Sequence, residues 1–213
     1  MAELGFAQND EDLILARFFG TQKSGFFVDA GAFDGITYSN TYLLERRGWD
    51  GLCIEPNPQS HARCTTNRTA TCIQTALVSD PTMKTVTLRI PPMAILTTLA
   101  DDHDADIQTI HRNVGELFTG WHEESVPAMT LDKVLAYFVD NRPIDLLTID
   151  CEWRNADVLA GCDLKRWQPR VLVVETGAGV RDMLTDYYVV LEHGSNYFCV
   201  RDAQDIERMS DAY

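Results

Sequence analysis

Basic residues are scarce in this 213-residue sequence, where 18 Lys and Arg stand against 32 Asp and Glu and the formal net charge at pH 7 is -14. Such a chain repels phosphate backbones at long range, so we expect no nucleic-acid partner. Long apolar runs are also missing: no window approaches the roughly 18 consecutive apolar residues of a membrane span, so we expect no membrane association through one. The N-terminus lacks a basic stretch followed by an apolar one, which argues against a signal peptide.

Paired cysteines are missing as well. None of the six cysteines belongs to a C-x-x-C motif, and three of them stand inside apolar runs. We therefore expect reduced thiols in the core of a cytoplasmic protein, not disulfides or a zinc motif. The six are Cys53, Cys64, Cys72, Cys151, Cys162 and Cys199.

Linkers, internal repeats and low-complexity tracts are not found, so we expect a single domain over residues 1–213. The composition, 45% apolar and 23% charged, is typical of a globular protein and excludes an intrinsically disordered chain. A chain of this length can bury a sizeable core without disulfides.

Short apolar runs alternate with segments of helical periodicity. Continuous apolar runs are typical of strands buried on both faces, so the pattern predicts an α/β fold: a doubly wound parallel sheet with helices on both faces. The predicted strands are 26–28, 51–54, 71–73, 144–149 and 171–174. The predicted helices run from a cap at Asn9 or Asp10 to Phe19, from Ser39 to Gly48, over 131–138, and from Asn155 to Gly161.

Two segments depart from this alternation. Residues 187–191 and 197–200 are rich in aromatic and β-branched side chains and flank a turn-rich segment, which predicts a closing antiparallel hairpin. The polar stretch 101–125 lies between a strand-like run at 86–90 and the helix near Leu131. We expect this stretch to be an insertion that covers the ligand edge of the sheet.

A glycine motif follows the first predicted strand, where open α/β sheets bind ligands. Residues 29–35 have the spacing D-x-G-x-x-x-G, which differs from the G-x-G-x-x-G of dinucleotide enzymes and argues against a nicotinamide dehydrogenase. The second strand ends in Glu55, 26 positions after Asp29, where a carboxylate can accept both hydroxyls of a ribose. Together the two features indicate an adenosine-type ligand.

Three further carboxylates follow later strands. Asp150 and Glu152 come directly after the fourth predicted strand, and Glu175 comes after the fifth. Such acids can serve as a general base, as acceptors for a ligand ammonium group, or as ligands for Mg²⁺ or Mn²⁺. In the plainer alternative, Glu152 or Glu175 forms a solvated ion pair with Arg154 or Arg181.

These motifs resemble those of the FkbM-type methyltransferases, class I enzymes that use S-adenosylmethionine. The resemblance covers nearly the whole chain. Residues 7–12 are similar to the family's S-Q-x-x-E-D box, 28–35 to its glycine motif, 39–41 to the helix start that follows, 53–58 to its ribose-binding strand end, 126–132 to its V-P-x-x-T-L-D segment and 144–152 to its I-D-x-L-x-I-D-x-E strand. The chain departs from the family's D-x-E-G-x-E, because Trp153 replaces the glycine and Asn155-Ala156-Asp157 follows.

The resemblance implies a Rossmann-like class I methyltransferase sheet with strand order 3-2-1-4-5-7-6, in a single methyltransferase domain. It also implies that Asp29 and Gly31 lie against the methionine end of the cofactor, that Glu55 binds the ribose, and that Asp150 lies nearest the sulfonium. Thr75 and Ala76 would flank the adenine, and Gln8 would close the pocket. The remaining residues of the implied cofactor site are Asp34, Ser39 and Pro56.

For the reaction, the resemblance implies S-adenosylmethionine-dependent O-methylation of a small-molecule hydroxyl, on a sugar-bearing or polyketide-type metabolite. Asp150 and Glu152 are the predicted catalytic residues. The relation of Asp150 to Glu175 is similar to the metal ligands of catechol O-methyltransferase, so Asp150, Glu152 and Glu175 form a candidate Mg²⁺ or Mn²⁺ site. An alternative general base is one of His103, His111 and His122.

A rival hypothesis stays open at this point. Trp153 favours a non-catalytic module that binds S-adenosylmethionine or a nucleotide, because a large indole stands where the family has no side chain and can reshape or block the acceptor pocket. The retained Asp29, Glu55 and Asp150 oppose that hypothesis. The sequence leaves open whether the protein is a monomer or a homodimer.

Overall fold

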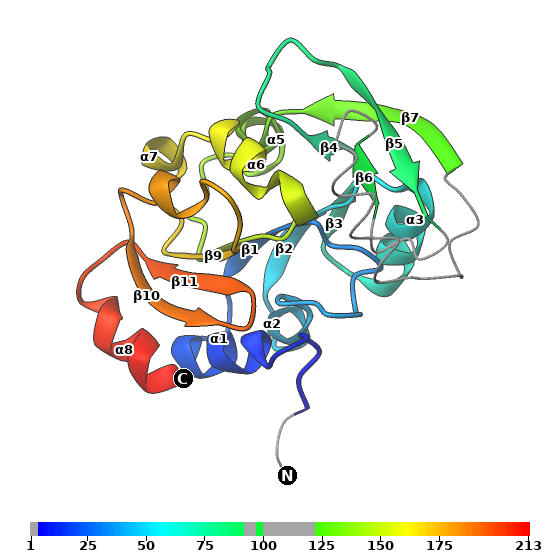
Figure 1. Cartoon of the computed structure of the whole chain (residues 1–213). Helices are drawn as coiled ribbons and strands as arrows, with labels where there is room; N and C mark the ends of the chain where they lie inside the picture. Colours follow the sequence, from blue (N-terminus) through cyan, green and yellow to red (C-terminus); the bar gives the residue numbers. More distant parts are fainter. Residues whose placement is uncertain (1–3, 92–96, 100–121) are drawn as a thin grey trace.

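The computed structural model describes residues 4–91, 97–99 and 122–213, which form a seven-stranded sheet, a smaller second sheet and surrounding helices (Figure 1). The central strands consist almost entirely of buried residues, as expected for a parallel sheet covered on both faces. The strands of the large sheet are β1 (Phe26–Ala30), β2 (Asp50–Ile54), β3 (Thr71–Ile73), β8 (Leu146–Ile149), β9 (Val171–Glu175), β10 (Tyr188–His193) and β11 (Asn196–Val200).

The strand order of the large sheet is β10-β11-β9-β8-β1-β2-β3. Strands β3, β2, β1, β8 and β9 run parallel, whereas β11 is antiparallel to both β9 and β10. Numbered along the chain and read from β3, the seven strands stand in the order 3-2-1-4-5-7-6. The carboxyl ends of five parallel strands therefore meet at one edge of the sheet.

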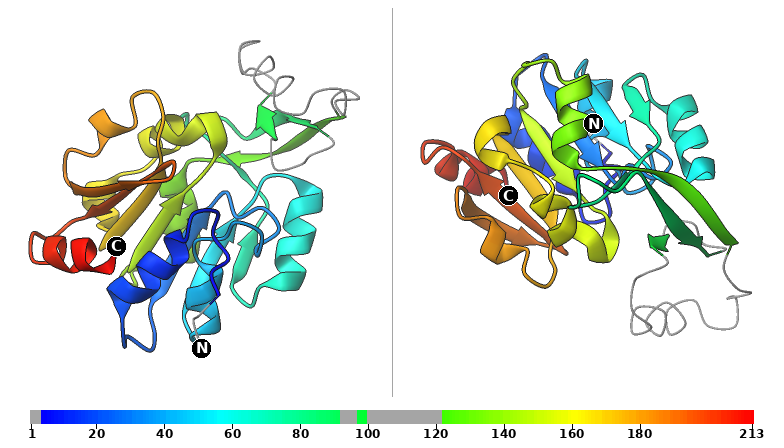
Figure 2. Two further views of the ribbon diagram at one scale, coloured as in Figure 1. Left: turned by 60° about the horizontal axis from the view of Figure 1, so that its bottom comes forward. Right: turned by 90° about the horizontal axis from the view of Figure 1, so that it is seen from above.

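Helices cover both faces of this sheet, so the predicted α/β class is confirmed (Figure 2). The helices on one face are α1 (Glu11–Phe19), α2 (Tyr42–Arg46), α3 (Pro58–Asn67) and α8 (Asp205–Ala212). Those on the other face are α5 (Leu131–Phe138), α6 (Asn155–Ala160) and α7 (Leu164–Trp167). Two short 3-10 turns, η3 (Glu152–Arg154) and η4 (Arg181–Met183), follow β8 and β9. Within the described ranges, no helix is both long and apolar enough to cross a bilayer.

The starts of α5 and α2 can be compared with the helices that the sequence predicts. Thr130 caps α5 by accepting a hydrogen bond from Lys133 N. Leu131, Val134 and Leu135 of that helix are buried, whereas Phe138 at its end is 44% exposed, so the apolar stripe is shorter than the sequence spacing predicts. The helix predicted from Ser39 to Gly48 is shorter than expected and spans only α2. Ser39 still acts at its start, since its hydroxyl oxygen accepts from the backbone N–H of Tyr42 at 3.1 Å.

A second sheet, which the sequence did not predict, has the order β4-β7-β5-β6 and extends away from the large sheet (Figure 2). Its strands are β4 (Ala76–Leu77), β5 (Thr85–Ile90), β6 (Thr98–Leu99) and β7 (His122–Met129). Residues 122–125, placed in the insertion 101–125 by their polarity, belong to β7, because His122 pairs with Ile90 and the antiparallel register continues along β5. The rest of that insertion, with His103 and His111, lies outside the described residues.

The closing hairpin is confirmed, with one correction. Strands β10 and β11 are antiparallel and pair from Tyr188↔Val200 to His193↔Asn196. Glu192 and His193 therefore belong to β10, not to the turn, because a two-residue connection at Gly194 and Ser195, with a positive φ of 58° at the glycine, is enough to reverse the chain.

The burial of strand β1 predicts how much unfolding free energy is lost when one of its side chains is truncated. Phe27 on β1 is 0% exposed, so Phe27→Ala leaves a cavity and should cost about 3–5 kcal/mol of unfolding free energy. Tyr137, 67% exposed on α5, is the matched control, and Tyr137→Ala should change stability by less than about 0.5 kcal/mol. Equilibrium denaturant unfolding measures both; equal losses in the two variants would contradict the placement of Phe27.

Candidate functional site

A cavity of about 470 Å³ opens at the carboxyl edge of the large sheet. Gly31 after β1, Glu55 after β2, Asp150 after β8 and Glu175 at the end of β9 contribute to its wall, and Leu88 of the second sheet lies on it too. Between β1 and β8 the order of the strands reverses relative to the chain, and open α/β sheets place their ligand crevices at this point.

Gly31 permits a close approach of two strand ends. Its φ is +95°, and a Cβ built there would lie 1.8 Å from the carbonyl oxygen of Asp150. Only glycine fits this position without moving the backbone, because a side chain would collide with main-chain atoms. The glycine thus brings the β1 loop and the β8 end to the same side of the cavity.

Asp29 lies below this loop and points into the protein. Its carboxylate accepts hydrogen bonds from the hydroxyls of Thr41 (2.5 Å) and Thr148 (3.1 Å), and Arg68 Nη1 lies 3.8 Å from it. Burial raises the pKa of Asp29, while Arg68 and the two hydroxyls counteract part of that rise. The cavity wall, as formed by the described residues, does not include Asp29, and the structure places this carboxylate beneath the loop.

Asp34 and Ser39 also have internal roles. The Asp34 carboxylate accepts from the backbone N–H groups of Ile36 (2.9 Å) and Thr37 (2.7 Å), and Ser39 caps α2. Neither is among the described residues on the cavity wall, although Phe33, Thr37 and Asn40 are. The motif therefore located the loop correctly, but its polar side chains shape the backbone and their neighbours face the cavity.

Glu55 lines the cavity as predicted. Its two carboxylate oxygens accept from the backbone N–H groups of Phe33 (2.9 Å) and Asn57 (2.8 Å), which fixes the side chain at the end of β2. Burial raises its pKa to about 7, against the lowering effect of these two hydrogen bonds. The other predicted residues on the wall are Gln8, Pro56, Thr75 and Ala76.

The family model that matches this chain is the Methyltransferase FkbM domain, over residues 29–200. The chain belongs to the FkbM methyltransferase family. Among solved structures it is similar to a TehB-like SAM-dependent methyltransferase from Corynebacterium glutamicum, with 12% identity, a TM-score of 0.44, and 91% of this chain and 86% of that chain covered. It is also similar to M. capricolum TrmK in complex with S-adenosyl-homocysteine, with 11% identity and a TM-score of 0.39. That similarity covers 88% of this chain and 65% of that chain. No curated protein matches the chain.

In this FkbM methyltransferase three acids meet beyond β8 and β9, and all three lie on the cavity wall. Asp150 is open to the cavity but surrounded by protein atoms, so desolvation and then the Glu175 and Asp29 carboxylates raise its pKa to about 7. Desolvation, followed by the charge of Asp150, also raises the pKa of Glu152 to about 7. The pKa of Glu175 is raised by desolvation as well.

Asn155, which the motif analysis did not select, holds this acidic loop together. Its amide nitrogen donates to Glu175 Oε2 (2.7 Å) and to the carbonyl of Glu152 (2.6 Å), and its amide oxygen accepts from Cys151 N (2.8 Å). Glu152 has a left-handed backbone, with φ 52°, and these contacts maintain that conformation. The cap predicted at Asn155 is wrong, because Arg154 precedes the helix as its cap residue and the Asn155 side chain bonds to the loop instead.

The predicted Mg²⁺ or Mn²⁺ site is not assembled. Within residues 4–91, 97–99 and 122–213, the only group of three potential ligands whose atoms lie within 4.8 Å of one another consists of cysteines and excludes Asp150, Glu152 and Glu175. Asn155 already takes one oxygen of Glu175. The three acids share a cavity without forming a three-oxygen ligand set.

Trp153 lies outside the cavity. Its side chain is 40% exposed, and it is not among the described residues on the wall. The indole therefore does not block the cavity of this FkbM methyltransferase. His122, one of the alternative bases, is exposed on β7 beside Glu124 (3.5 Å) and likewise stands outside the described cavity wall.

Glu11 is a cavity residue that the sequence reasoning missed. It is buried on α1, and its carboxylate accepts from Asn9 N (2.7 Å) and from the Asn196 amide (3.1 Å), which joins the N-terminal helix to the start of β11. The same S-Q-x-x-E-D box that indicated Gln8 contains Glu11. The signal was therefore available.

The raised pKa values predict how stability depends on pH. Glu55, Asp150 and Glu152 have pKa values near 7 in the folded protein, against ordinary values of 4.5, 3.8 and 4.5. Between the ordinary and the raised pKa values, the folded protein holds protons that the unfolded chain has released. The free energy of unfolding therefore falls as the pH rises through that range. Glu152→Gln removes one such group and should gain on the order of 1 kcal/mol over wild type between pH 5 and pH 8.

Thermal unfolding at several pH values, without cofactor, measures this gain. Glu192→Gln, an exposed position on β10, is the control and should keep the wild-type dependence on pH. A Glu152→Gln profile parallel to that of wild type would show that Glu152 ionises normally in the folded protein.

Proposed function

We propose that this FkbM methyltransferase transfers a methyl group from S-adenosylmethionine to a hydroxyl oxygen of a small molecule, such as a sugar-bearing or polyketide-type metabolite. The observation that carries the proposal is one cavity that joins Glu55, after β2, to Asp150 and Glu152, after β8. The cavity thus offers a carboxylate suited to a ribose together with two carboxylates whose pKa values are raised to about 7.

The charge of the cavity fits this cofactor. Five carboxylates line it, from Glu11, Glu55, Asp150, Glu152 and Glu175. S-adenosylmethionine carries a sulfonium and an ammonium group, and a cationic ligand is attracted to such a wall because water screens charges only weakly inside a cavity. The volume of about 470 Å³ is also within the usual range for small-molecule sites.

The proposed contacts use residues on the cavity wall. In the proposed complex Glu55 accepts hydrogen bonds from the ribose hydroxyls, Thr75 and Ala76 lie beside the adenine, and Gln8 closes the pocket. Gly31 lets the backbone approach the ligand. Asp29 acts one step away, since it holds Thr41 and Thr148 beneath the loop.

When bound, S-adenosylmethionine supplies an electrophilic methyl group, so the protein's own task is alignment and uptake of a proton. Asp150 or Glu152 in its ionised form accepts the proton of the acceptor hydroxyl and becomes a carboxylic acid. A base with a pKa near 7 suits this step at neutral pH. The proposal assigns the step to a carboxylate and not to Mg²⁺ or Mn²⁺, because the three acids do not form a ligand set.

The direct test incubates the protein with methyl-labelled S-adenosylmethionine and a panel of hydroxyl-bearing sugars and polyketide-type compounds. Label in an ether product is the expected result. Tight binding of S-adenosylmethionine by calorimetry with no transfer to any acceptor would instead support the non-catalytic binding module. Binding of NADH alone would overturn the assignment of the cofactor.

Glu55→Ala tests the ribose contact. Hydrogen bonds to a charged acceptor contribute about 1.5–3 kcal/mol, so the variant should bind S-adenosylmethionine at least about tenfold more weakly. Glu55→Gln, which keeps one acceptor oxygen, should lose less. Calorimetry measures the affinities, and thermal unfolding establishes that both variants are folded. Unchanged affinity in a folded Glu55→Ala protein would remove Glu55 from the cofactor site.

Asp150→Asn separates catalysis from binding. The amide cannot take up a proton, so turnover should fall on the order of 10²-fold or more, while affinity for S-adenosylmethionine stays within a few-fold of wild type. Steady-state kinetics with the acceptor found in the panel, together with calorimetry, gives both quantities. Equal losses of turnover and affinity would make Asp150 a cofactor-binding residue only.

A further inference from the structure

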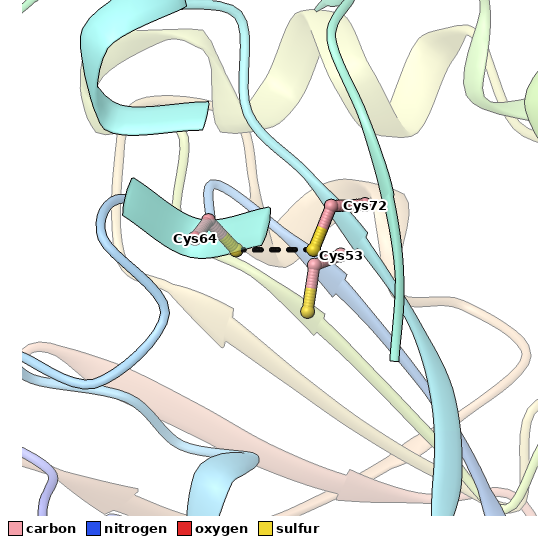
Figure 3. Close-up of side chains that lie close together, drawn as sticks. All are labelled: Cys53, Cys64 and Cys72. Carbon is pink, nitrogen blue, oxygen red and sulfur yellow. Dashed lines mark hydrogen bonds between the residues drawn. The ribbon is translucent and has the colours of Figure 1, made fainter. Parts of the chain in front are cut away.

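Three cysteine side chains from consecutive elements meet inside the protein, away from the cavity (Figure 3). Cys53 is on β2, Cys64 on α3 and Cys72 on β3. Their Sγ atoms all lie within 4.8 Å of one another, and those of Cys64 and Cys72 are 3.5 Å apart. None of the three lines the cavity formed by the described residues, so the methyl-transfer proposal does not use them.

The fold itself brings these thiols together. Cys53 and Cys72 are direct partners in the parallel pairing of β2 with β3, so their side chains point to the same face of the sheet. Helix α3 packs on that face and places Cys64 against them. Cys53 and Cys64 are buried, whereas Cys72 is partly exposed and provides access from solvent.

A ring nitrogen lies close to the thiols along the chain. His61 lies on α3 one turn before Cys64, and its Nε2 atom is buried with no hydrogen-bond partner among the described residues. Three converging thiols and an unsatisfied ring nitrogen therefore belong to the same part of the fold.

We propose that Cys53, Cys64 and Cys72 form a binding site for a soft, thiophilic metal ion such as Zn²⁺ or Cd²⁺. Each thiol loses its proton to solvent and donates a sulfur electron pair to the ion, so no oxidant or reductant takes part. Thiolate sulfur is the ligand such ions prefer, with metal–sulfur distances of about 2.3 Å for Zn²⁺. Sulfurs 3.5 Å apart need to move little to share one ion.

The position of the cluster also supports a metal ion. A disulfide uses two sulfurs, whereas here three converge. The site joins β2, α3 and β3. Glu55 on the cavity wall lies two residues after Cys53, and Thr75 lies three residues after Cys72. A bound ion therefore links the elements that form one wall of the cavity.

The test is a Cd²⁺ titration of the reduced full-length protein, followed by its sulfur-to-metal charge-transfer absorption and by elemental analysis. One ion per chain and a rise in the thermal unfolding temperature are expected. Loss of an outer-shell partner weakens metal binding about 10–100-fold, so Cys72→Ser, which removes a ligand, should weaken it by at least about 100-fold. Cys162→Ser, at a partly exposed thiol outside the cluster, should bind like wild type.

A second measurement on the wild-type protein covers the case in which Cys72→Ser does not fold. Alkylation followed by peptide mass mapping should show that Cd²⁺ protects Cys72 and leaves Cys162 reactive. Equal affinity in Cys72→Ser and wild type, or no charge-transfer absorption in reduced wild type, would overturn the proposal.

Discussion

The carboxyl edge of the large sheet, where the cavity opens, depends on the ion pairs and hydrogen bonds of one buried guanidinium, that of Arg68. It pairs with Glu45 on α2 (2.6 Å), donates to the carbonyl of Gly35 (3.0 Å) and to the Thr41 hydroxyl (2.9 Å), and lies beside Asp29 on β1. A buried charge persists only where it is paired and hydrogen-bonded, and removing one partner typically costs about 3–5 kcal/mol. This network therefore fixes the glycine loop relative to β1 and α2, and Gly31 with it.

The same arrangement explains why the cavity wall is acidic and why the pKa values of its carboxylates are raised. Arg68 compensates Asp29 and Glu45 inside the protein, so its charge does not serve the carboxylates of the cavity wall. Those groups keep raised pKa values because protein atoms replace part of their hydration and because neighbouring carboxylates repel their charge. A cationic ligand relieves that repulsion, so a site that lowers the stability of the free protein at neutral pH gains most when it is filled.

Strand ends were the predictable part of this site. Continuous apolar runs showed where β1, β2, β8 and β9 lie, and parallel strands place their carboxyl ends together, so Glu55, Asp150 and Glu175 could be located from the sequence. Side-chain direction within a loop has no such period. Asp29 accepts from two threonine hydroxyls and Asp34 accepts from backbone N–H groups of its own loop, and the motif alone did not predict either direction.

Contacts between distant segments escaped for a related reason. The pairing of β5 with β7 joins residues 85–90 to residues 122–127, which are distant in the sequence. The polar start of β7 reads as part of an insertion, because one face of that strand is exposed. The thiol cluster depends on the register of β2 with β3 and on the packing of α3, and the spacing of Cys53, Cys64 and Cys72 matches no short motif.

The loop after β8 shows how this chain accommodates its departure from the family pattern. Where the D-x-E-G-x-E pattern has its glycine, the Trp153 indole faces outward, and where it has its second glutamate this chain has Asn155. A carboxylate at that position would oppose Glu175, whereas the Asn155 amide donates to Glu175 at 2.7 Å. The amide thereby removes one negative charge from a cavity that already has five carboxylates, and it holds Glu152 in its left-handed conformation. Asn155 thus stands where a further acid would face Glu175, and its amide fixes the loop that contains Glu152.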